Sequence, residues 1–593
     1  MKLHVTAGAC AIALAVLFLG GCTAASEAPD GGAPDGSTDG GADGSADGST
    51  DGGVRNVVVK TESMVPMRDG AKLNTRVYLP SEIPAGGLPA VFERTPYGFP
   101  SDEEGFDTTG AYFVSLGYAY LLQDVRGRFK SEGVFEPMKN EFADGFDATA
   151  WIVKQPWSSG KIGTWGGSYT GFTAVATAVD NPLVSVVIAD DAAADFKFDF
   201  HNGVFSLHPL DWLYVLDHND WMDPDGKAQM TNALDLATLD QTMLGHKGEF
   251  YQQLLAIEGR VSDTFWKDRT LDGRYGGLCA PLLSVLSFPT AWDDPVRIFD
   301  GARLDGCEKH RKNARLVVTS EGHCYHMSVF SGHRTPVNQL MIDYLDTYLK
   351  GADRGLDTAP QVVYHSPGEY SYRKGASWPL SDSTAGWFLH NDNPDPTYGW
   401  LSADKPGAEK PDVVALDPAV MDACTINEPY YPYFLYASEA LDKDAYVDGA
   451  ATVDLWISAT SPDVDFFAYL LIYDGATMKY DYMLSAGMRA RYRDGPEKAV
   501  LLTPNAPALL KIEFFPMTYL VPAGKSLMLV LYNADCVSSE NALTGETLAT
   551  QSIWGKASVR VLHDADHPSS VTLPLQEADP GRWMKDVVVL DCQ

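Results

Sequence analysis

The sequence predicts a mostly parallel α/β sheet domain followed by an all-β domain. Between residues 90 and 188, short apolar runs alternate with helical patterns, as in βαβ units. Within this part, Ser168 lies between a strand-like run at 162–165 and a helical run at 173–179. From residue 381 onward, apolar runs are separated by turns rich in Gly, Pro, Asp and Asn, and helical patterns are scarce.

The first residues have the pattern of an export signal. Lys2 precedes an apolar run at 7–19, which is too short to span a membrane, and the run ends in Leu19-Gly20-Gly21-Cys22. This ending resembles the bacterial lipoprotein signal, in which the cysteine becomes the lipidated first residue. We therefore expect residues 1–22 to form a lipoprotein signal peptide and the exported protein to be anchored through Cys22 on the periplasmic or cell-surface side of a membrane. The alternative is an ordinary signal peptide with a chance cysteine.

Residues 23–54 are dominated by Gly, Ser, Ala, Asp and Pro, and Asp-Gly recurs along them. Such a segment has too little apolar surface to offset the entropy of ordering, so we expect a flexible tether. The ligand spacing of an EF-hand loop is absent, which favours a solvated acidic linker over a calcium site.

Composition narrows the classes of partner. The net charge of -34 disfavours nucleic acid and other acidic polymers. An exported location permits disulfides among the six cysteines that follow Cys22, and the sequence does not choose their pairing. CxxC pairs are absent, which argues against a zinc site. We expect no metal and no organic cofactor.

The α/β domain is predicted to begin with a hairpin and to continue as alternating elements. Runs at 57–59 and 73–79 flank Met67-Arg68-Asp69-Gly70, which contains a D-G turn. Further strands are expected at 90–94, 118–124, 162–165 and 184–188, and an amphipathic helix at 143–154. These elements place the first part of the domain at residues 55–194.

The pattern changes at residues 195–278, where aromatic and acidic residues mix with helical stretches at 232–244 and 248–258. We interpret this segment as a helical cap inserted into the sheet domain. The sheet resumes within residues 279–380, with strands at 280–287 and 315–318 and a helix at 336–350 capped by Gly351. Residues 381–593 then form the all-β domain.

Ser168 has the surroundings of a nucleophile elbow, a sharp strand-to-helix turn that exposes a serine. Gly166 lies two residues before it, but Thr170 occupies the place where the strict G-x-S-x-G pattern has a second glycine. On these residues alone, a plain βα loop is an equally good interpretation.

The order of three residue types strengthens the enzymatic interpretation. Ser168 follows one strand, Asp293 or Asp294 a later one, and His323 the last, which is the order of an α/β-hydrolase triad. A serine hydroxyl is a weak nucleophile until an imidazole takes its proton, and the imidazole needs a carboxylate to orient it.

Several motifs together resemble the cocaine esterase / Xaa-Pro dipeptidyl-peptidase family of α/β-hydrolases, which includes the α-amino acid ester hydrolases. The similar motifs are Arg94-Thr95-Pro96-Tyr97, Asp124-Val125-Arg126-Gly127-Arg128, Gln155-Pro156-Trp157-Ser158 and Gly166-Gly167-Ser168-Tyr169-Thr170-Gly171. The elbow of that family is G-x-S-Y-x-G, which this chain satisfies. The resemblance implies an α/β-hydrolase domain with a helical cap, followed by a C-terminal jelly-roll domain.

The resemblance also implies site residues. Ser168 is the expected nucleophile, and the hydroxyl of Tyr97 and the backbone N–H of Tyr169 are the expected oxyanion hole. The family places its acid after a tryptophan near the end of a strand, so Trp292-Asp293 fits best, with Asp294 as the alternative.

The family writes G-P-W-x-H before its catalytic histidine, whereas this chain has Thr319-Ser320-Glu321-Gly322-His323. His323 is therefore the expected base, and His326 is the alternative.

The all-β part is predicted from strands at 451–457, 466–473 and 526–532, and residues 458–466 are similar to the jelly-roll signature of the family. We expect this domain to pack on the hydrolase domain and wall its pocket rather than to bind carbohydrate independently.

These observations predict a serine hydrolase that cleaves an ester or amide through an acyl-enzyme. In amino-ester hydrolases further carboxylates follow the acid, but here Pro295 and Val296 follow Asp294, which favours a neutral acyl or aryl ester. The alternatives are an Xaa-Pro dipeptidyl aminopeptidase, an α-amino acid ester hydrolase, and a catalytically inactive surface binding lipoprotein. The expected partner is a small ester, amide or short peptide. Nucleic acid is not expected, and contact with the membrane is expected only through the lipid on Cys22.

Overall fold

The computed structural model describes most of the chain after residue 57. The described residues are 58–99, 107–220, 222–223, 226, 230, 236–257, 263–287, 293–328, 335–367, 372–375, 377–379, 383–393, 398–416, 433–533 and 557–577. The predicted signal peptide, the tether and Cys22 lie outside these residues and stay predictions. Within the described residues, no helix combines the length and the apolar character needed to cross a membrane.

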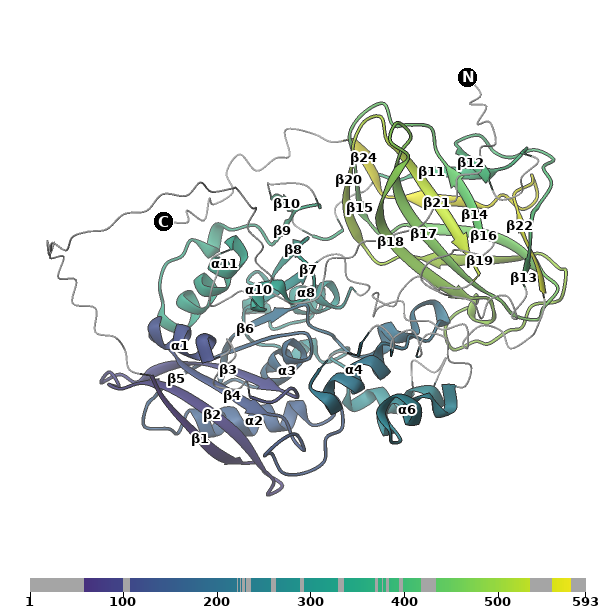
Figure 1. The fold of residues 1–593 in the computed structure, drawn as a ribbon. Coiled ribbons are helices and arrows are strands. Elements are labelled where there is room, and N and C mark those ends of the chain that lie inside the picture. The colour runs from purple at the N-terminus through teal and green to yellow at the C-terminus, as the bar shows by residue number, and fades with distance from the viewer. Residues whose placement is uncertain are drawn as a thin grey trace, which may run out of the picture.

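A ten-stranded sheet organises the first part of the chain, and a second, all-β part follows it (Figure 1). The strand order is β1-β2-β4-β3-β5-β6-β7-β8-β9-β10, and all neighbours from β4 to β9 are parallel. The strands are β1 (Val58–Pro66), β2 (Lys72–Pro80), β3 (Leu88–Thr95), β4 (Ala119–Asp124), β5 (Ser158–Gly167), β6 (Val184–Asp190), β7 (Leu282–Ser287), β8 (Arg315–Thr319), β9 (Val362–Tyr364) and β10 (Arg373–Gly375). The predicted α/β class is confirmed.

Helices cover both faces of this sheet. They are α1 (Asp107–Ser115), α2 (Glu141–Ile152), α3 (Tyr169–Ala178), α8 (Asp294–Leu304), α9 (Glu308–Arg311), α10 (Tyr325–Ser328) and α11 (Pro336–Leu345). Along β6, Val187 packs with α3 and α8, whereas Val186 and Ile188 pack with α1 and α11. Because successive side chains of a strand point to opposite faces, a sheet covered on both sides needs continuous apolar strands. This requirement explains why the central strands are short uninterrupted apolar runs.

The predicted hairpin, the helix at 143–154 and the helix at 336–350 are confirmed, the last as α11 continued by a π-helical turn, Asp346–Lys350. Gly351 ends it in the left-handed conformation, with φ of 73°. One boundary differs from the prediction. Helix α3 begins at Tyr169, immediately after Ser168, rather than at residue 173. Gly171 lies inside this helix, where a Cβ would come within 2.7 Å of Ala192, so this glycine serves close packing and not a turn.

Helices connect β6 to β7. They are η1 (Lys197–Gly203), α4 (His208–His218), α6 (Leu236–Leu244), α7 (Glu249–Ala256), η2 (Thr264–Asp268) and η3 (Tyr275–Gly277). Their inner faces bury aromatic rings, and Phe196 and Phe250 pack with Trp212 of α4. The start of the helical stretch predicted at 232–244 lies outside the described residues. The backbone N–H of Leu271 donates to the carbonyl of Ala194 at 3.0 Å, which closes the base of the insertion.

A disulfide joins Cys279, just before β7, to Cys307, just after α8. Cys324 is not disulfide-bonded. Cys424, Cys536 and Cys592 lie outside the described residues. The structure therefore identifies one disulfide among the pairings that the sequence left open. This disulfide connects the segment just before β7 to the segment just after α8.

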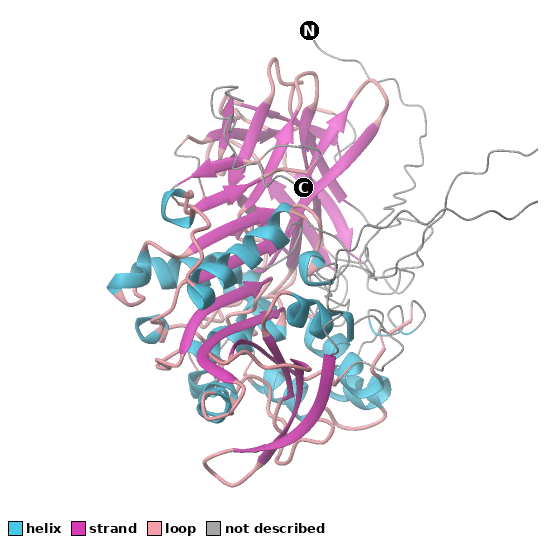
Figure 2. Ribbon diagram, turned by 90° about the vertical axis from the view of Figure 1, so that its left-hand side faces the viewer, coloured by secondary structure: helices cyan, strands magenta, loops and turns pink. Residues whose placement is uncertain are grey.

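The second part is built from strands (Figure 2). They are β11 (Ala385–His390), β12 (Tyr398–Ser402), β13 (Asp412–Leu416), β14 (Tyr433–Ala437), β15 (Ala445–Gly449), β16 (Thr452–Ala459), β17 (Asp465–Asp474), β18 (Lys479–Arg489), β19 (Ala508–Glu513), β20 (Met517–Val521), β21 (Ser526–Tyr532), β22 (Ala557–Leu562), β23 (Ser570–Leu573) and β24 (Leu575–Glu577). Burial alternates along β13 and the first half of β16, which places one side of each strand in the core. The predicted all-β domain is confirmed.

A buried ion pair joins the two parts. Arg373 of β10 donates to both carboxylate oxygens of Asp448 of β15, at 2.7 and 3.2 Å, and both side chains are almost fully buried. Thr518 and Gln576 also donate to Asp448, at 2.7 and 2.8 Å. The guanidinium lies over the rings of Tyr364 and Tyr446, one from each part. The two charges compensate each other, and each carboxylate oxygen of Asp448 accepts two hydrogen bonds.

Replacing Asp448 by alanine should destabilise the protein by about 3–5 kcal/mol, because it leaves the Arg373 guanidinium buried without an anion. Urea unfolding of wild type and Asp448→Ala measures the difference. Lys443→Ala is the matched control: it removes an exposed ion pair with Glu577 just before β15, and we expect a change below about 1 kcal/mol. Equal effects of the two substitutions would contradict the importance of the Arg373–Asp448 pair.

Candidate active site

The turn between β5 and α3 holds Ser168 in a strained backbone conformation. Its φ and ψ are 54° and -122°, a combination that non-glycine residues rarely adopt and that is found at functional sites. The backbone N–H of Ser168 donates to the carbonyl of Asp190 at the end of β6, at 2.9 Å. Ser168 is partly exposed while the residues on either side are buried, so the turn presents this hydroxyl at the edge of the sheet.

The residues around Ser168 show why the elbow accepts Thr170. A Cβ on Gly166 would lie 2.1 Å from the carbonyl oxygen of Thr170, so the chain needs glycine before the serine. The Thr170 hydroxyl accepts from the N–H of Gly167 at 2.7 Å and donates to the Gly167 carbonyl at 2.9 Å. Thr170 therefore closes the turn with its side chain, at the position where the strict pattern has glycine.

Two hydrogen-bond donors lie beside Ser168. Tyr169 is the first residue of α3, and the N–H groups of a first helical turn have no partner within the helix. The Tyr97 hydroxyl accepts from Nε1 of Trp212 at 3.1 Å. Burial raises the pKa of Tyr97 to about 12, although hydrogen bonding with Trp212 and Ser168 acts in the opposite direction. Tyr97 is therefore a neutral hydroxyl, in contact with Ser168, at neutral pH.

The side chain of Tyr169 points away from the reacting hydroxyl and anchors the turn. Its hydroxyl donates to Glu141 at 2.9 Å and accepts from the N–H of Met138 at 2.8 Å. Its ring stacks on Trp212 at 5.5 Å between centroids. Trp212 thus contacts both tyrosines that the sequence analysis assigned to the oxyanion hole.

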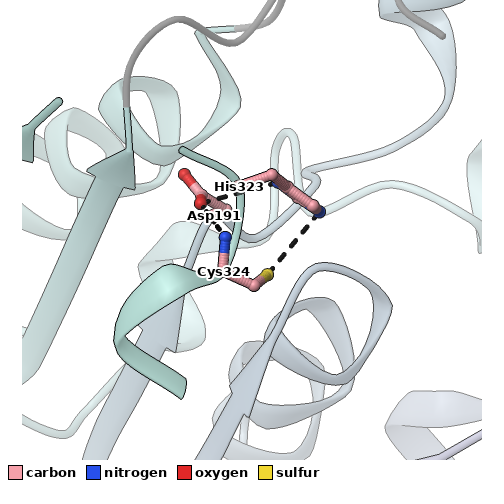
Figure 3. A group of neighbouring side chains, drawn as sticks. All are labelled: Asp191, His323 and Cys324. Carbon is pink, nitrogen blue, oxygen red and sulfur yellow. Dashed lines mark hydrogen bonds and ion pairs between the residues drawn. The ribbon is translucent and has the colours of Figure 1, made fainter. Parts of the chain in front are cut away.

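His323 follows β8, and the carboxylate next to it is Asp191 (Figure 3). Nδ1 of His323 lies 3.5 Å from Oδ2 of Asp191, which is fully buried, while the imidazole is 39% exposed. Asp191 comes directly after β6 and has φ of 46°. Its carboxylate accepts from the N–H of Ser287 at the end of β7 and from the N–H of Cys324, both at 2.6 Å. The ends of three strands therefore position this carboxylate against the imidazole.

Asp293, the predicted acid, lies at the start of the segment after β7 that the structure describes. It precedes α8, where burial raises its pKa while Arg297 and His201 act to lower it. Trp292 lies outside the described residues. Asp294 is fully buried, accepts from the N–H of Ala194 at 2.7 Å and pairs with Arg297. Among the described contacts, the carboxylate beside His323 is that of Asp191, and Asp293 with its alternative Asp294 stays a prediction for the triad acid.

Sequence reasoning missed Asp191 because it followed the family pattern to the end of β7. A signal was present: Asp190 and Asp191 end the strand next to the elbow strand, and carboxyl ends of parallel strands lie at one edge of a sheet. The two acids differ in environment. Burial and the neighbouring Asp191 raise the pKa of Asp190 well above its usual range.

His326, the alternative base, is fully buried and lies between two hydroxyls. Its ring nitrogens are 3.2 Å from Oγ1 of Thr319 and 3.2 Å from Oγ1 of Thr335. Burial lowers the pKa of His326. These contacts suit a histidine that stabilises the loop after β8.

Glu321 contributes to the same loop. Its burial alone would raise its pKa, but hydrogen bonding with His365 and Thr319 holds the pKa at about 2. Nε2 of His365 lies 3.3 Å from Oε1 of Glu321. Glu321 occupies a position where the family pattern has Pro-Trp. Its contact with His365 connects the loop that carries His323 to the residue after β9.

Among the described residues, one group combines three metal-ligating side chains. The ligand atoms of Asp191, His323 and Cys324 lie within 4.8 Å of one another. Sequence reasoning about CxxC pairs could not find it, because Asp191 is distant in sequence from the other two.

Comparisons with known proteins agree with this fold. Residues 69–325 match the X-Pro dipeptidyl-peptidase (S15 family) model, and residues 354–572 match the X-Pro dipeptidyl-peptidase C-terminal non-catalytic domain. Cocaine esterase of Rhodococcus sp. (strain MB1 Bresler) is 25% identical over 587 residues, which covers 88% of this chain and 99% of the esterase.

Solved structures share the fold. An aminopeptidase from a marine sediment Thaumarchaeota archaeon superposes with a TM-score of 0.71 at 20% identity, covering 91% of this chain and 99% of its own. An α-amino acid ester hydrolase gives a TM-score of 0.70 at 21% identity, with 89% and 98% covered. The two matched domain models occur in sequence order, and cocaine esterase aligns over nearly its whole length. The chain therefore belongs to the cocaine esterase / X-Pro dipeptidyl-peptidase family of α/β-hydrolases, and it is a serine hydrolase.

Proposed function

We propose that this chain hydrolyses a carboxylic ester through an acyl-enzyme on Ser168, with His323 as the base and Asp191 as the carboxylate that orients it. The observation that carries this proposal is the contact between a buried carboxylate and an exposed imidazole, at the same sheet edge as a serine in a strained turn. The roles of nucleophile, base and orienting acid need those three groups at one edge.

The contact between His323 and Asp191 indicates which tautomer of the imidazole this mechanism uses. With Nδ1 facing Asp191, the proton of the neutral ring is on Nδ1 and the lone pair is on Nε2. Nε2 takes the proton of Ser168 as Oγ attacks the substrate carbonyl. The same proton passes from Nε2 to the leaving alcohol, and the acyl group stays on Ser168. Water then attacks the acyl-enzyme with His323 again as base, which releases the acid and restores the serine.

The oxyanion is stabilised by Tyr97 and by the N–H of Tyr169. Because Trp212 donates to the Tyr97 oxygen, the proton of that hydroxyl is available to the substrate oxygen. The raised pKa of Tyr97, about 12, keeps this proton in place throughout the neutral range. A fixed donor at this position stabilises charge that develops only in the transition state.

The charges near the insertion favour a neutral acyl group. Arg297 pairs with Asp195, Asp272 and Asp294, and Lys197 pairs with Asp195 and Asp272. These carboxylates already have cationic partners, which disfavours their use as a clamp for a substrate ammonium. This argument supports an acyl or aryl ester over an α-amino acid ester.

The covalent step is tested by intact-mass analysis of the purified protein after incubation with a fluorophosphonate. We expect one adduct per chain on wild type, mapped to Ser168, and none on Ser168→Ala. Turnover of p-nitrophenyl acetate should be lost in the same variant. Absence of an adduct on folded wild type would overturn the proposal and support a surface binding protein.

Tyr97→Phe should lower kcat for p-nitrophenyl acetate by about two to three decades, because it removes one oxyanion donor. Because the aromatic ring stays, the variant should fold with an intact turn, and its thermal midpoint should change little. Tyr214→Phe, a partly buried tyrosine of the same α4 helix as Trp212, is the control and should keep its activity. A kcat of Tyr97→Phe equal to wild type would exclude the hydroxyl from the oxyanion hole.

Asp191→Asn should lower kcat by about four decades, because the ring of His323 loses the carboxylate that sets its tautomer. Asp293→Asn should change kcat less than about tenfold. Thermal unfolding and circular dichroism of both variants check that the sheet is intact. The reverse order of effects would return the role of triad acid to Asp293.

Family membership leaves one enzymatic alternative, an Xaa-Pro dipeptidyl aminopeptidase, because the matched model carries that name. Dipeptide release from an Xaa-Pro anilide, measured beside hydrolysis of a simple aryl ester, separates the two. Higher kcat/KM for the anilide would support the peptidase.

A further inference from the structure

The side chains of His323 and Cys324 face one another although they are adjacent in sequence (Figure 3). Cys324 has φ of 53°, a left-handed conformation that turns its side chain back toward the histidine. Its Sγ lies 3.6 Å from Nε2 of His323. The other ring nitrogen, Nδ1, lies 3.5 Å from Asp191, and one ligand atom from each of the three residues lies within 4.8 Å of the other two.

The separation of sulfur and nitrogen fits a metal. A zinc ion bound at about 2.3 Å by a thiolate and about 2.1 Å by an imidazole, at a tetrahedral angle, holds these two atoms about 3.6 Å apart. The observed distance is 3.6 Å. The pair can therefore ligate one ion without a rearrangement of the backbone.

Asp191 supplies the outer part of such a site. Metal-bound histidines usually donate their other ring N–H to a carboxylate, which fixes the ring and raises its basicity. Oδ2 of Asp191 lies 3.5 Å from the other ring nitrogen, Nδ1, and the fully buried carboxylate accepts from the N–H groups of Ser287 and Cys324. Its charge also compensates that of a bound cation.

We propose that Sγ of Cys324 and Nε2 of His323, with the Asp191 carboxylate beside them, bind a thiophilic divalent cation such as Zn²⁺, and that binding inhibits hydrolysis. On binding, the thiol gives its proton to water and the thiolate and the neutral imidazole each donate an electron pair to the metal, with no change of oxidation state. The inhibition rests on the proposed function, because the metal occupies the lone pair that takes the Ser168 proton.

Binding is tested first, apart from activity, in the Ser168→Ala background. Zinc content after equilibrium dialysis, and the absorption of bound Co²⁺ that reports thiolate ligation, are compared in Ser168→Ala and Ser168→Ala/Cys324→Ala. We expect the second protein to bind one ion fewer and to lose the thiolate absorption. Equal content and spectra would overturn the metal site, whether or not the wild type hydrolyses any ester.

Inhibition is tested next, with each protein compared with its own metal-free rate on p-nitrophenyl acetate in buffered Zn²⁺. We expect Cys324→Ala to need at least about tenfold more Zn²⁺ for half inhibition than wild type. His246→Asn is the matched control: it removes an exposed imidazole that lies 2.6 Å from Asp217 but has no thiol beside it, and its inhibition should match wild type. Cys324-dependent binding without inhibition would overturn the regulatory part. If wild type does not hydrolyse the ester at all, the proposed function fails while the binding comparison still decides the metal site.

Discussion

The active edge of the sheet depends on one buried carboxylate. Asp191 is the first residue after β6. Its carboxylate accepts backbone hydrogen bonds from the end of β7 and from the loop after β8, and it contacts the imidazole of His323. The neighbouring residue Asp190 accepts the backbone hydrogen bond of Ser168 through its carbonyl. The proposed nucleophile and base are thus positioned by the same short segment. A buried charge with directed hydrogen bonds has few alternative arrangements, which makes it suitable for fixing catalytic geometry.

Much of this arrangement could be predicted from the sequence. The βα alternation, the elbow at Ser168 and the late β strands follow from local periodicity and turn residues, and the structure reproduces them. The position of Tyr97 at a strand end was also readable. The carboxylate beside His323 could not be predicted, because it depends on which strands have their carboxyl ends close together in space. Local patterns could not show that α8 begins with Asp294 paired to Arg297, nor that the loop after β8 reaches back to the end of β6.

Charge compensation recurs away from the reacting residues. Arg297 is surrounded by carboxylates, and Arg94 is buried against Glu141, whose other contact is the hydroxyl of Tyr169. Each of these arginines compensates a buried carboxylate, and the Arg94–Glu141 pair supports the elbow from behind.

The Arg373–Asp448 pair has a consequence for how such a protein can change during evolution. Because each domain contributes one charge to a buried contact, neither gene segment can be exchanged for an unrelated one without leaving an ion without its counter-ion. Recombination that joined this catalytic half to a foreign β domain would be selected against unless both positions changed together. The two halves are therefore expected to be inherited as one unit, with their substitutions at these two positions correlated.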